Sequence, residues 1–111
     1  MAKGTGVILV MTSMPDRESA LDLAKALVQE RLAACVNVLS GTESVYWWKG
    51  EIKQASEVAV LIKTAEGLRS NLEAAIRACH PYELPEIIAV PVVDGLADYL
   101  EWVLSEVKTD P

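Results

Sequence analysis

Two short runs of the chain are apolar at every position. Residues 7–11 read Val-Ile-Leu-Val-Met and residues 58–62 read Val-Ala-Val-Leu-Ile. Aliphatic and β-branched residues in runs of this length predict β-strands, and the first run ends before Pro15, which cannot continue a central strand. Because neither run alternates with polar residues, we expect both strands to be central in a sheet and buried on both faces.

Three other segments show helical spacing, in which apolar residues recur every three or four positions. Helices are predicted at residues 16–34, 65–79 and 96–107. The last segment keeps the helical offsets over its whole length, which makes it the clearest helix of the sequence. Its apolar residues are Leu96, Tyr99, Leu100, Val103, Leu104 and Val107.

The remaining strands are predicted at residues 35–48 and 86–93. The first of these has a bulge or kink at Ser40-Gly41, and the turn Lys49-Gly50 joins it to a long strand that ends with residues 58–62. Two long strands joined by a tight turn form an extended β-ribbon.

The predicted order of elements is βαββαβ followed by a C-terminal helix. With right-handed crossovers this order is the ferredoxin-like arrangement, an α+β sandwich in which two helices pack on a four-stranded antiparallel sheet. We expect a single domain over residues 7–108, with flexible termini at residues 1–6 and 109–111.

Two helices cover one face of such a sheet, and one extra helix is too small to cover the other face. Leaving a Val, Ile or Leu side chain exposed costs roughly 1.5–3 kcal/mol, and a patch of such residues is a site of association. The free edges of the ribbon also invite pairing with a neighbour. The pattern therefore predicts self-association.

Net charge and the length of the apolar runs argue against nucleic acid and membrane as partners. The formal net charge of -6 argues against nucleic acid, because proteins that bind its phosphate backbone gather Lys and Arg on one face. The apolar run at residues 7–11 is too short for a signal-peptide core or a membrane span, so we expect a cytoplasmic protein without a membrane partner. In that compartment Cys35 and Cys79 are expected to be free thiols.

Five short segments have distinctive sequences that occur in a fixed order. They are 30–37 (ERLAACVN), 46–50 (YWWKG), 61–64 (LIKT), 80–87 (HPYELPEI) and 99–102 (YLEW). Together they resemble the CutA family, the divalent-cation tolerance proteins, over nearly the whole chain. The resemblance implies a tight homotrimer packed through its sheets and ribbons, similar in architecture to the PII signalling proteins. It also implies a cytoplasmic role in metal tolerance, with copper as the usual ligand.

Four candidate metal donors cluster where the second helix meets the last strand: Cys79, His80, Glu83 and Glu86. Thiolate and imidazole suit copper or zinc, and carboxylates can complete the coordination. The resemblance implies that Cys79 and His80 occupy donor positions of the family. Thr12 stands where some members have a further Cys. The expected ligand is copper(II) or another divalent cation, bound weakly.

Cys79 and His80 also have a structural interpretation, and so does the second cysteine, Cys35. Cys79 lies on the predicted apolar stripe with Leu72 and Ile76, where a cysteine packs as a small apolar residue. The ring of His80 could instead cap the helix end or bond a backbone carbonyl, because Pro81 restricts His80 to extended conformations. Cys35 has no second sulfur nearby, which favours packing over redox chemistry.

The aromatic residues are predicted to lie in contacts between subunits. Tyr46, Trp47 and Trp48 alternate between the faces of the ribbon, and Trp102 lies on the polar side of the last helix.

No nucleophile elbow or metalloprotease motif is present, and one histidine offers little acid–base chemistry, so we expect no enzymatic activity.

Two functions follow. The first is a trimeric metal-tolerance protein that binds divalent ions near Cys79 and His80. The second is a non-enzymatic, PII-like trimeric sensor or scaffold that binds a small ligand or a protein in the clefts between subunits.

Overall fold

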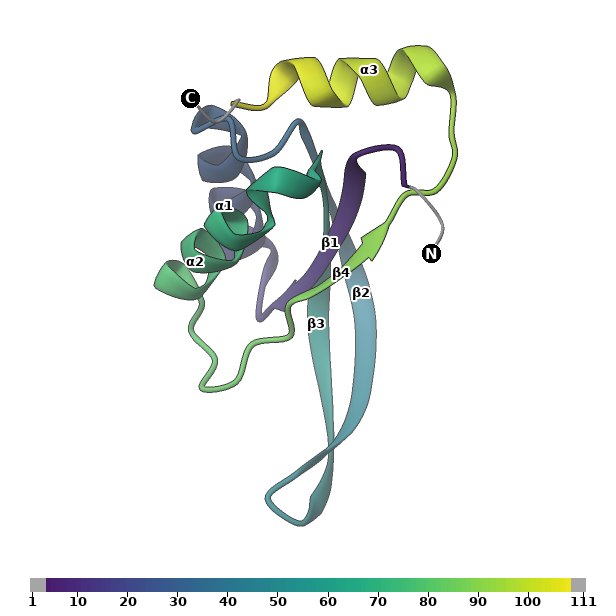
Figure 1. Cartoon of the computed structure of the whole chain (residues 1–111). Helices are drawn as coiled ribbons and strands as arrows, with labels where there is room; N and C mark the ends of the chain where they lie inside the picture. Colours follow the sequence, from purple (N-terminus) through teal and green to yellow (C-terminus); the bar gives the residue numbers. More distant parts are fainter. Residues whose placement is uncertain (1–3, 109–111) are drawn as a thin grey trace.

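The computed structural model describes residues 4–108 and follows the predicted order of elements (Figure 1). The elements are β1 (Val7–Met14), α1 (Arg17–Gln29), β2 (Cys35–Trp48), β3 (Glu51–Ala65), the 3-10 turn η1 (Glu66–Leu68), α2 (Arg69–Cys79), β4 (Ile88–Pro91) and α3 (Ala97–Glu106). The strands form one antiparallel sheet in the order β2-β3-β1-β4. The predicted α+β, ferredoxin-like fold is confirmed, with β1 and β3 at its centre.

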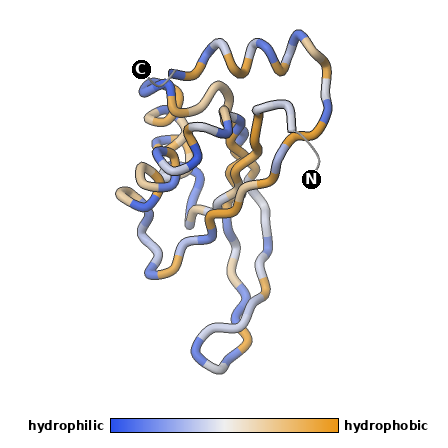
Figure 2. Tube along the Cα trace, in the orientation of Figure 1, coloured by the Kyte–Doolittle hydropathy of each residue, from blue (hydrophilic) through white to orange (hydrophobic). Residues whose placement is uncertain are grey.

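The hydrophobic core lies between the sheet and the pair of helices α1 and α2. Alternate residues of β1 and β3 face these helices, and the pairing Val10↔Ile62 places both side chains in the core. Leu27 of α1 and Leu72 of α2 pack against them. Figure 2 shows the apolar residues concentrated along the central strands.

The opposite face of the sheet is apolar but incompletely covered, as expected for a chain whose one extra helix is too small to cover it. Leu9, Met11 and Leu61 are half-buried there, and Ile88 on β4 is 48% exposed. By their register these residues share one face with several others, and we call this set the open face: Leu9, Met11, Leu39, Ala59, Leu61, Ile88 and Val90.

Helix α3 covers only one end of the open face, because it is short and crosses the sheet where β1 begins and β3 ends (Figure 1). Its Val103 is fully buried, and the ammonium of Lys63 lies 5.9 Å from the ring centroid of Tyr99. At the C-terminal end of α3, Glu106 forms a 2.9 Å ion pair with Arg31, which follows α1. The remainder of the open face has no cover within the described residues.

Strands β2 and β3 continue past the end of β1 as the predicted ribbon. The turn at its tip has Lys49 and Gly50 at positive φ, 50° and 81°, which matches the twist of a tight hairpin. The register between β2 and β3 shifts between Leu39 and Thr42, which confirms the predicted kink around Gly41.

Some predicted boundaries are wrong by several residues. Helix α1 ends at Gln29 instead of residue 34, because Arg31 adopts a positive φ of 61° and the N–H groups of Leu32 and Ala33 return to the Leu27 carbonyl. The last strand spans only Ile88–Pro91 instead of 86–93, since two prolines flank or end it.

The predicted flexible termini are only partly within the described residues. Residues 1–3 and 109–111 lie outside them. Thr5 is hydrogen-bonded to the Val92 carbonyl through both its N–H and its hydroxyl, so the ordered part of the chain begins before Val7.

Two buried threonines on the core face provide a test of packing. Thr12 Oγ1 has no hydrogen-bond partner within the described residues, whereas the hydroxyl of Thr64 donates to the Leu32 carbonyl at 2.7 Å. We expect Thr12→Val to raise the free energy of unfolding by about 1 kcal/mol, because it removes an unpaired buried hydroxyl. Thr64→Val should lower it by a similar amount. Urea denaturation at one protein concentration measures both, and a destabilising Thr12→Val would contradict the expectation.

Candidate functional site

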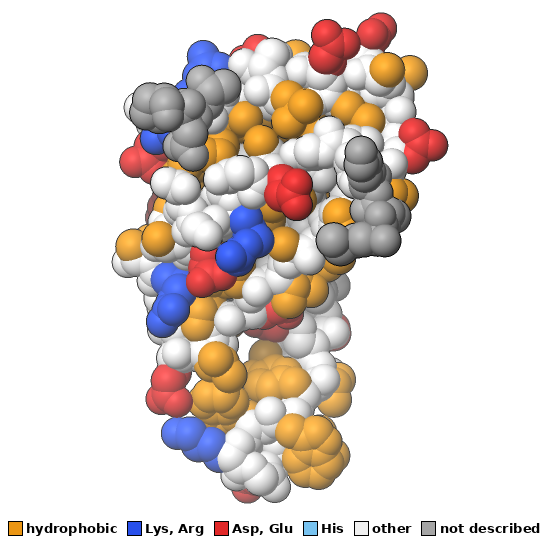
Figure 3. Space-filling model, in the orientation of Figure 1, with side chains coloured by type: hydrophobic (Ala, Val, Ile, Leu, Met, Phe, Trp, Pro, Cys, Tyr) orange, Lys and Arg blue, Asp and Glu red, His pale blue; other side chains and the backbone are white. Residues whose placement is uncertain are grey.

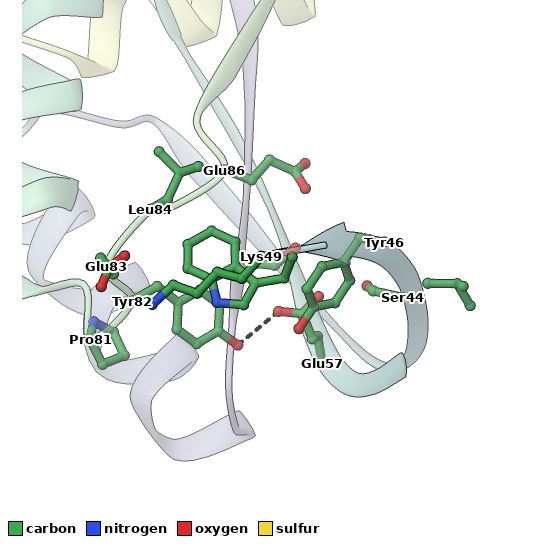
Figure 4. Close-up of a pocket in the computed structure, with 12 residues that line it drawn as sticks. Ser44, Tyr46, Lys49, Glu57, Pro81, Tyr82, Glu83, Leu84 and Glu86 are labelled. Atoms are coloured by element: carbon green, nitrogen blue, oxygen red, sulfur yellow. Dashed lines mark hydrogen bonds between the residues drawn. The ribbon is translucent and has the colours of Figure 1, made fainter. Parts of the chain in front are cut away.

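A cleft of about 740 Å³ lies between the ribbon and the loop that connects α2 to β4 (Figure 4). The ribbon forms one wall and residues 81–86 of the loop form the other. The lining residues are Ser13, Ser44, Val45, Tyr46, Trp48, Lys49, Glu57, Pro81, Tyr82, Glu83, Leu84 and Glu86.

His80 holds the loop against the end of β1. Helix α2 ends at Cys79, and His80 is extended with φ -81° and ψ 130°, as expected before a proline. Its Nε2 lies 2.7 Å from the Ser13 carbonyl, and its Nδ1 accepts the N–H of Tyr82 at 3.2 Å. This pattern requires a neutral ring protonated at Nε2. The interpretation that the ring bonds a backbone carbonyl is confirmed.

Tyr82 connects the loop to the ribbon side of the cleft. Its hydroxyl donates to Glu57 Oε2 at 2.7 Å (Figure 4), and its ring centroid lies 4.7 Å from that of His80. Burial raises the pKa of the Tyr82 phenol well above its ordinary value, and the hydrogen bond to Glu57 and the charge of that carboxylate raise it further. The phenol therefore stays protonated as a donor to the carboxylate.

The four predicted metal donors lie near one another in sequence but do not form a cage. The Cys79 thiol is exposed and lies 3.4 Å from the Ala75 carbonyl, so its interpretation as a core residue is wrong. It follows the buried Ile76 by three positions, in the last turn, where the helix has passed the edge of the core. Glu83 and Glu86 are exposed. Within residues 4–108, no three His, Cys, Asp or Glu side chains are placed to hold a metal ion.

The aromatic residues of the ribbon divide between two environments. Tyr46 and Trp48 line the cleft, where the ammonium of Lys49 lies 5.6 Å from the centroid of the Trp48 ring. Trp47 points to the other face beside Ile52, with which it is paired, and these two side chains are 71% and 63% exposed. Figure 3 shows hydrophobic side chains gathered over the ribbon.

Trp102, the fourth residue predicted at a subunit contact, lies on α3. Its ring packs against Tyr99, with centroids 5.6 Å apart, and it remains partly exposed.

Glu57 and Tyr82 form the central hydrogen bond of the cleft, and neither was among the predicted site residues. Glu57 lies 25 residues before Tyr82, and no local pattern connects the two. The only signal was the position of Glu57 as a charged residue directly before the apolar run at residues 58–62.

Residues 8–106 of the chain match the family described as CutA1 divalent ion tolerance protein. This chain belongs to that family. A curated relative, the divalent-cation tolerance protein CutA of Thermus thermophilus, is 43% identical over 95 residues, which cover 86% of this chain and 92% of the relative. The chloroplastic CutA 1 of rice is 41% identical over 101 residues, 91% of this chain but 57% of the rice protein.

A solved structure of CutA from Xylella fastidiosa has the same fold, with a TM-score of 0.90 and 44% sequence identity. The similarity covers 93% of this chain and 99% of that one. The family is described by divalent-ion tolerance, a role that agrees with the expectation of a non-enzymatic protein.

No helix within residues 4–108 is long and apolar enough to cross a membrane. The rice relative is named chloroplastic and a solved CutA of Archaeoglobus fulgidus is named periplasmic, so the family occupies more than one compartment.

The Tyr82 hydroxyl gives a prediction about pH. Tyr82→Phe should lower the free energy of unfolding by about 1 kcal/mol at pH 7, because Glu57 loses its donor. A raised pKa in the folded state stabilises the protein below the unfolded pKa of about 10 and loses this effect as the pH rises above it. Urea denaturation should therefore show a constant difference between the two proteins from pH 7 to 9 that shrinks above pH 10. A difference that grows above pH 10 would contradict the assignment.

Proposed function

We propose that this chain supports divalent-cation tolerance in the cytoplasm as a homotrimer that binds copper(II) or another divalent ion. The open face is the observation that carries the assembly. It presents apolar side chains on all four strands, from Leu39 on β2 to Ile88 and Val90 on β4. Burying such a surface against another copy removes apolar area from water, and the resemblance to CutA proteins implies that three copies meet.

The outer face of the ribbon supports the same assembly. Trp47 and Ile52 form an exposed cross-strand pair, and Val45 beside them is 67% exposed. A two-stranded ribbon gains little stability alone, and here it extends away from the body of the chain (Figure 1). Packing of this pair against a neighbouring copy would stabilise both, as in a PII-like trimer.

Breaking the open face tests the assembly. Ile88→Glu places a charge in the proposed contact, and we expect dissociation to smaller species at micromolar concentration, because an unpaired charge cannot be buried there. Val28→Glu is the matched control, since Val28 is 42% exposed on α1, away from the open face. Sedimentation velocity measures the mass of each. A wild-type monomer, or equal dissociation of both variants, would overturn the proposed trimer.

Metal binding is proposed at Cys79, His80, Glu83 and Glu86. The support is the accessible thiol of Cys79 and the exposed carboxylates that follow it within one short loop. Coordination by His80 requires one of its two ring hydrogen bonds to open. The bond from the Tyr82 N–H is the longer, at 3.2 Å against 2.7 Å to Ser13, so Nδ1 is the nitrogen that becomes available at lower cost. The free energy needed to open this hydrogen bond would make metal binding at His80 weak, as expected.

Calorimetry with Cu(II) tests the metal site. His80→Ala and Cys79→Ser are each expected to weaken binding about tenfold or more, because each removes a soft or borderline donor. Cys35→Ser is the control, since this thiol belongs to β2, outside the loop. Unchanged affinity in both loop variants would remove the site from residues 79–86.

A second candidate function is a PII-like trimeric sensor or scaffold that binds a small ligand or a protein in its clefts. The cleft of about 740 Å³ between the ribbon and the loop favours it, because this volume is typical of small-molecule sites. A ligand that binds only the folded protein would raise its melting temperature.

A further inference from the structure

The walls of the cleft are aromatic on both sides. Tyr46 and Trp48 line it from the ribbon, and Tyr82 lines it from the loop. The ammonium of Lys49 already lies 5.6 Å from the centroid of the Trp48 ring. Aromatic faces attract cations through their quadrupole, and this contact places an ammonium over the ring in the chain itself. The cleft therefore has surfaces that suit a positively charged ligand with an aliphatic body.

The cleft also contains a carboxylate without a cationic partner. Glu57 is partly buried, and within residues 4–108 no Lys, Arg or His nitrogen lies within ion-pair distance of it. The Tyr82 hydroxyl satisfies Oε2 but leaves the negative charge in place. An ammonium group placed beside Glu57 would gain a charge-assisted hydrogen bond in a setting less polar than bulk water.

Charge and size narrow the class of ligand. The lining carries three carboxylates, Glu57, Glu83 and Glu86, against the single ammonium of Lys49. Anions are disfavoured by this balance. A bare metal ion would occupy a small part of about 740 Å³, whereas a flexible chain of methylenes could lie along the aromatic walls.

The geometry points to this cleft as a binding site for a small aliphatic polyamine. One ammonium group pairs with Glu57, the methylene chain packs across Tyr46 and Trp48, and a further ammonium reaches the carboxylates of the loop. This inference rests on the second candidate function and names the class of ligand for it. It shares the loop carboxylates Glu83 and Glu86 with the proposed metal site but does not use Cys79 or His80.

Calorimetry with spermidine, on the assembled protein at constant ionic strength, tests the site. Glu57→Gln should weaken binding at least tenfold while keeping an oxygen that accepts the Tyr82 hydroxyl, so the fold is preserved. Trp48→Leu should weaken binding about threefold, through loss of the aromatic face. Tyr82→Phe keeps the carboxylate and frees its oxygen, so affinity should stay equal or rise.

Glu101→Gln is the matched control, because it removes the same charge from an exposed position on α3. Equal weakening by Glu57→Gln and Glu101→Gln would show general attraction to the acidic surface and overturn the proposal. Wild-type affinity in Glu57→Gln would also overturn it. Circular dichroism and sedimentation of each variant confirm that fold and assembly are intact, and Glu57→Asp, which retains the charge, should bind more tightly than Glu57→Gln.

Two further measurements separate this inference from the proposed functions. Copper binding should be unchanged in Glu57→Gln, and spermidine binding should be unchanged in Cys79→Ser. If spermidine does not bind but another class of small molecule raises the melting temperature, the second candidate function stands and the polyamine inference fails. A basic side chain of a second copy could fill the cleft in the assembled protein. Spermidine would then bind only after Ile88→Glu dissociates the assembly, and that result would also overturn the polyamine inference.

Discussion

The antiparallel pairing of β1 with β3 is the contact on which the rest of the structure depends. It runs from Val7↔Ala65 to Met14↔Val58 and places β2 and β4 at the edges of the sheet. One face of this pair carries the side chains that α1 and α2 bury. The other face is also apolar, and the short α3 covers only one end of it. One strand pair thus provides the core of the chain on one face and, on the other, an apolar surface that the chain itself covers only in part.

The end of that pairing also positions the cleft. Glu57 lies directly before Val58, the first residue of β3 that pairs with β1, so it stands where the ribbon joins the body. The carbonyl of Ser13, at the end of β1, receives the hydrogen bond from His80. The loop and the ribbon therefore meet at one place, and Tyr82 bridges them through Glu57.

The cleft region contains two different settings for cations. The outer one is the loop that follows Cys79. Its exposed thiol and carboxylates are of the types that suit a borderline or soft metal ion, but within residues 4–108 they are not placed together to hold one. The inner one has a partly buried carboxylate beside aromatic rings, which suit an organic ammonium group. His80 begins the loop with both ring nitrogens hydrogen-bonded, and one of these bonds would have to open for the ring to bind a metal ion.

The sequence alone determined the order of the elements, the ribbon and its turn at Lys49-Gly50, because these follow from local periodicity and backbone preference. It also located the loop that carries His80. Tertiary structure decided which part of the second sheet face α3 covers, that Cys79 is exposed, and that Glu57 meets Tyr82. Periodicity records which side chains avoid water, but it does not say which surface covers them. Contacts between residues distant in the chain depend on where whole strands end, and no short segment contains that information.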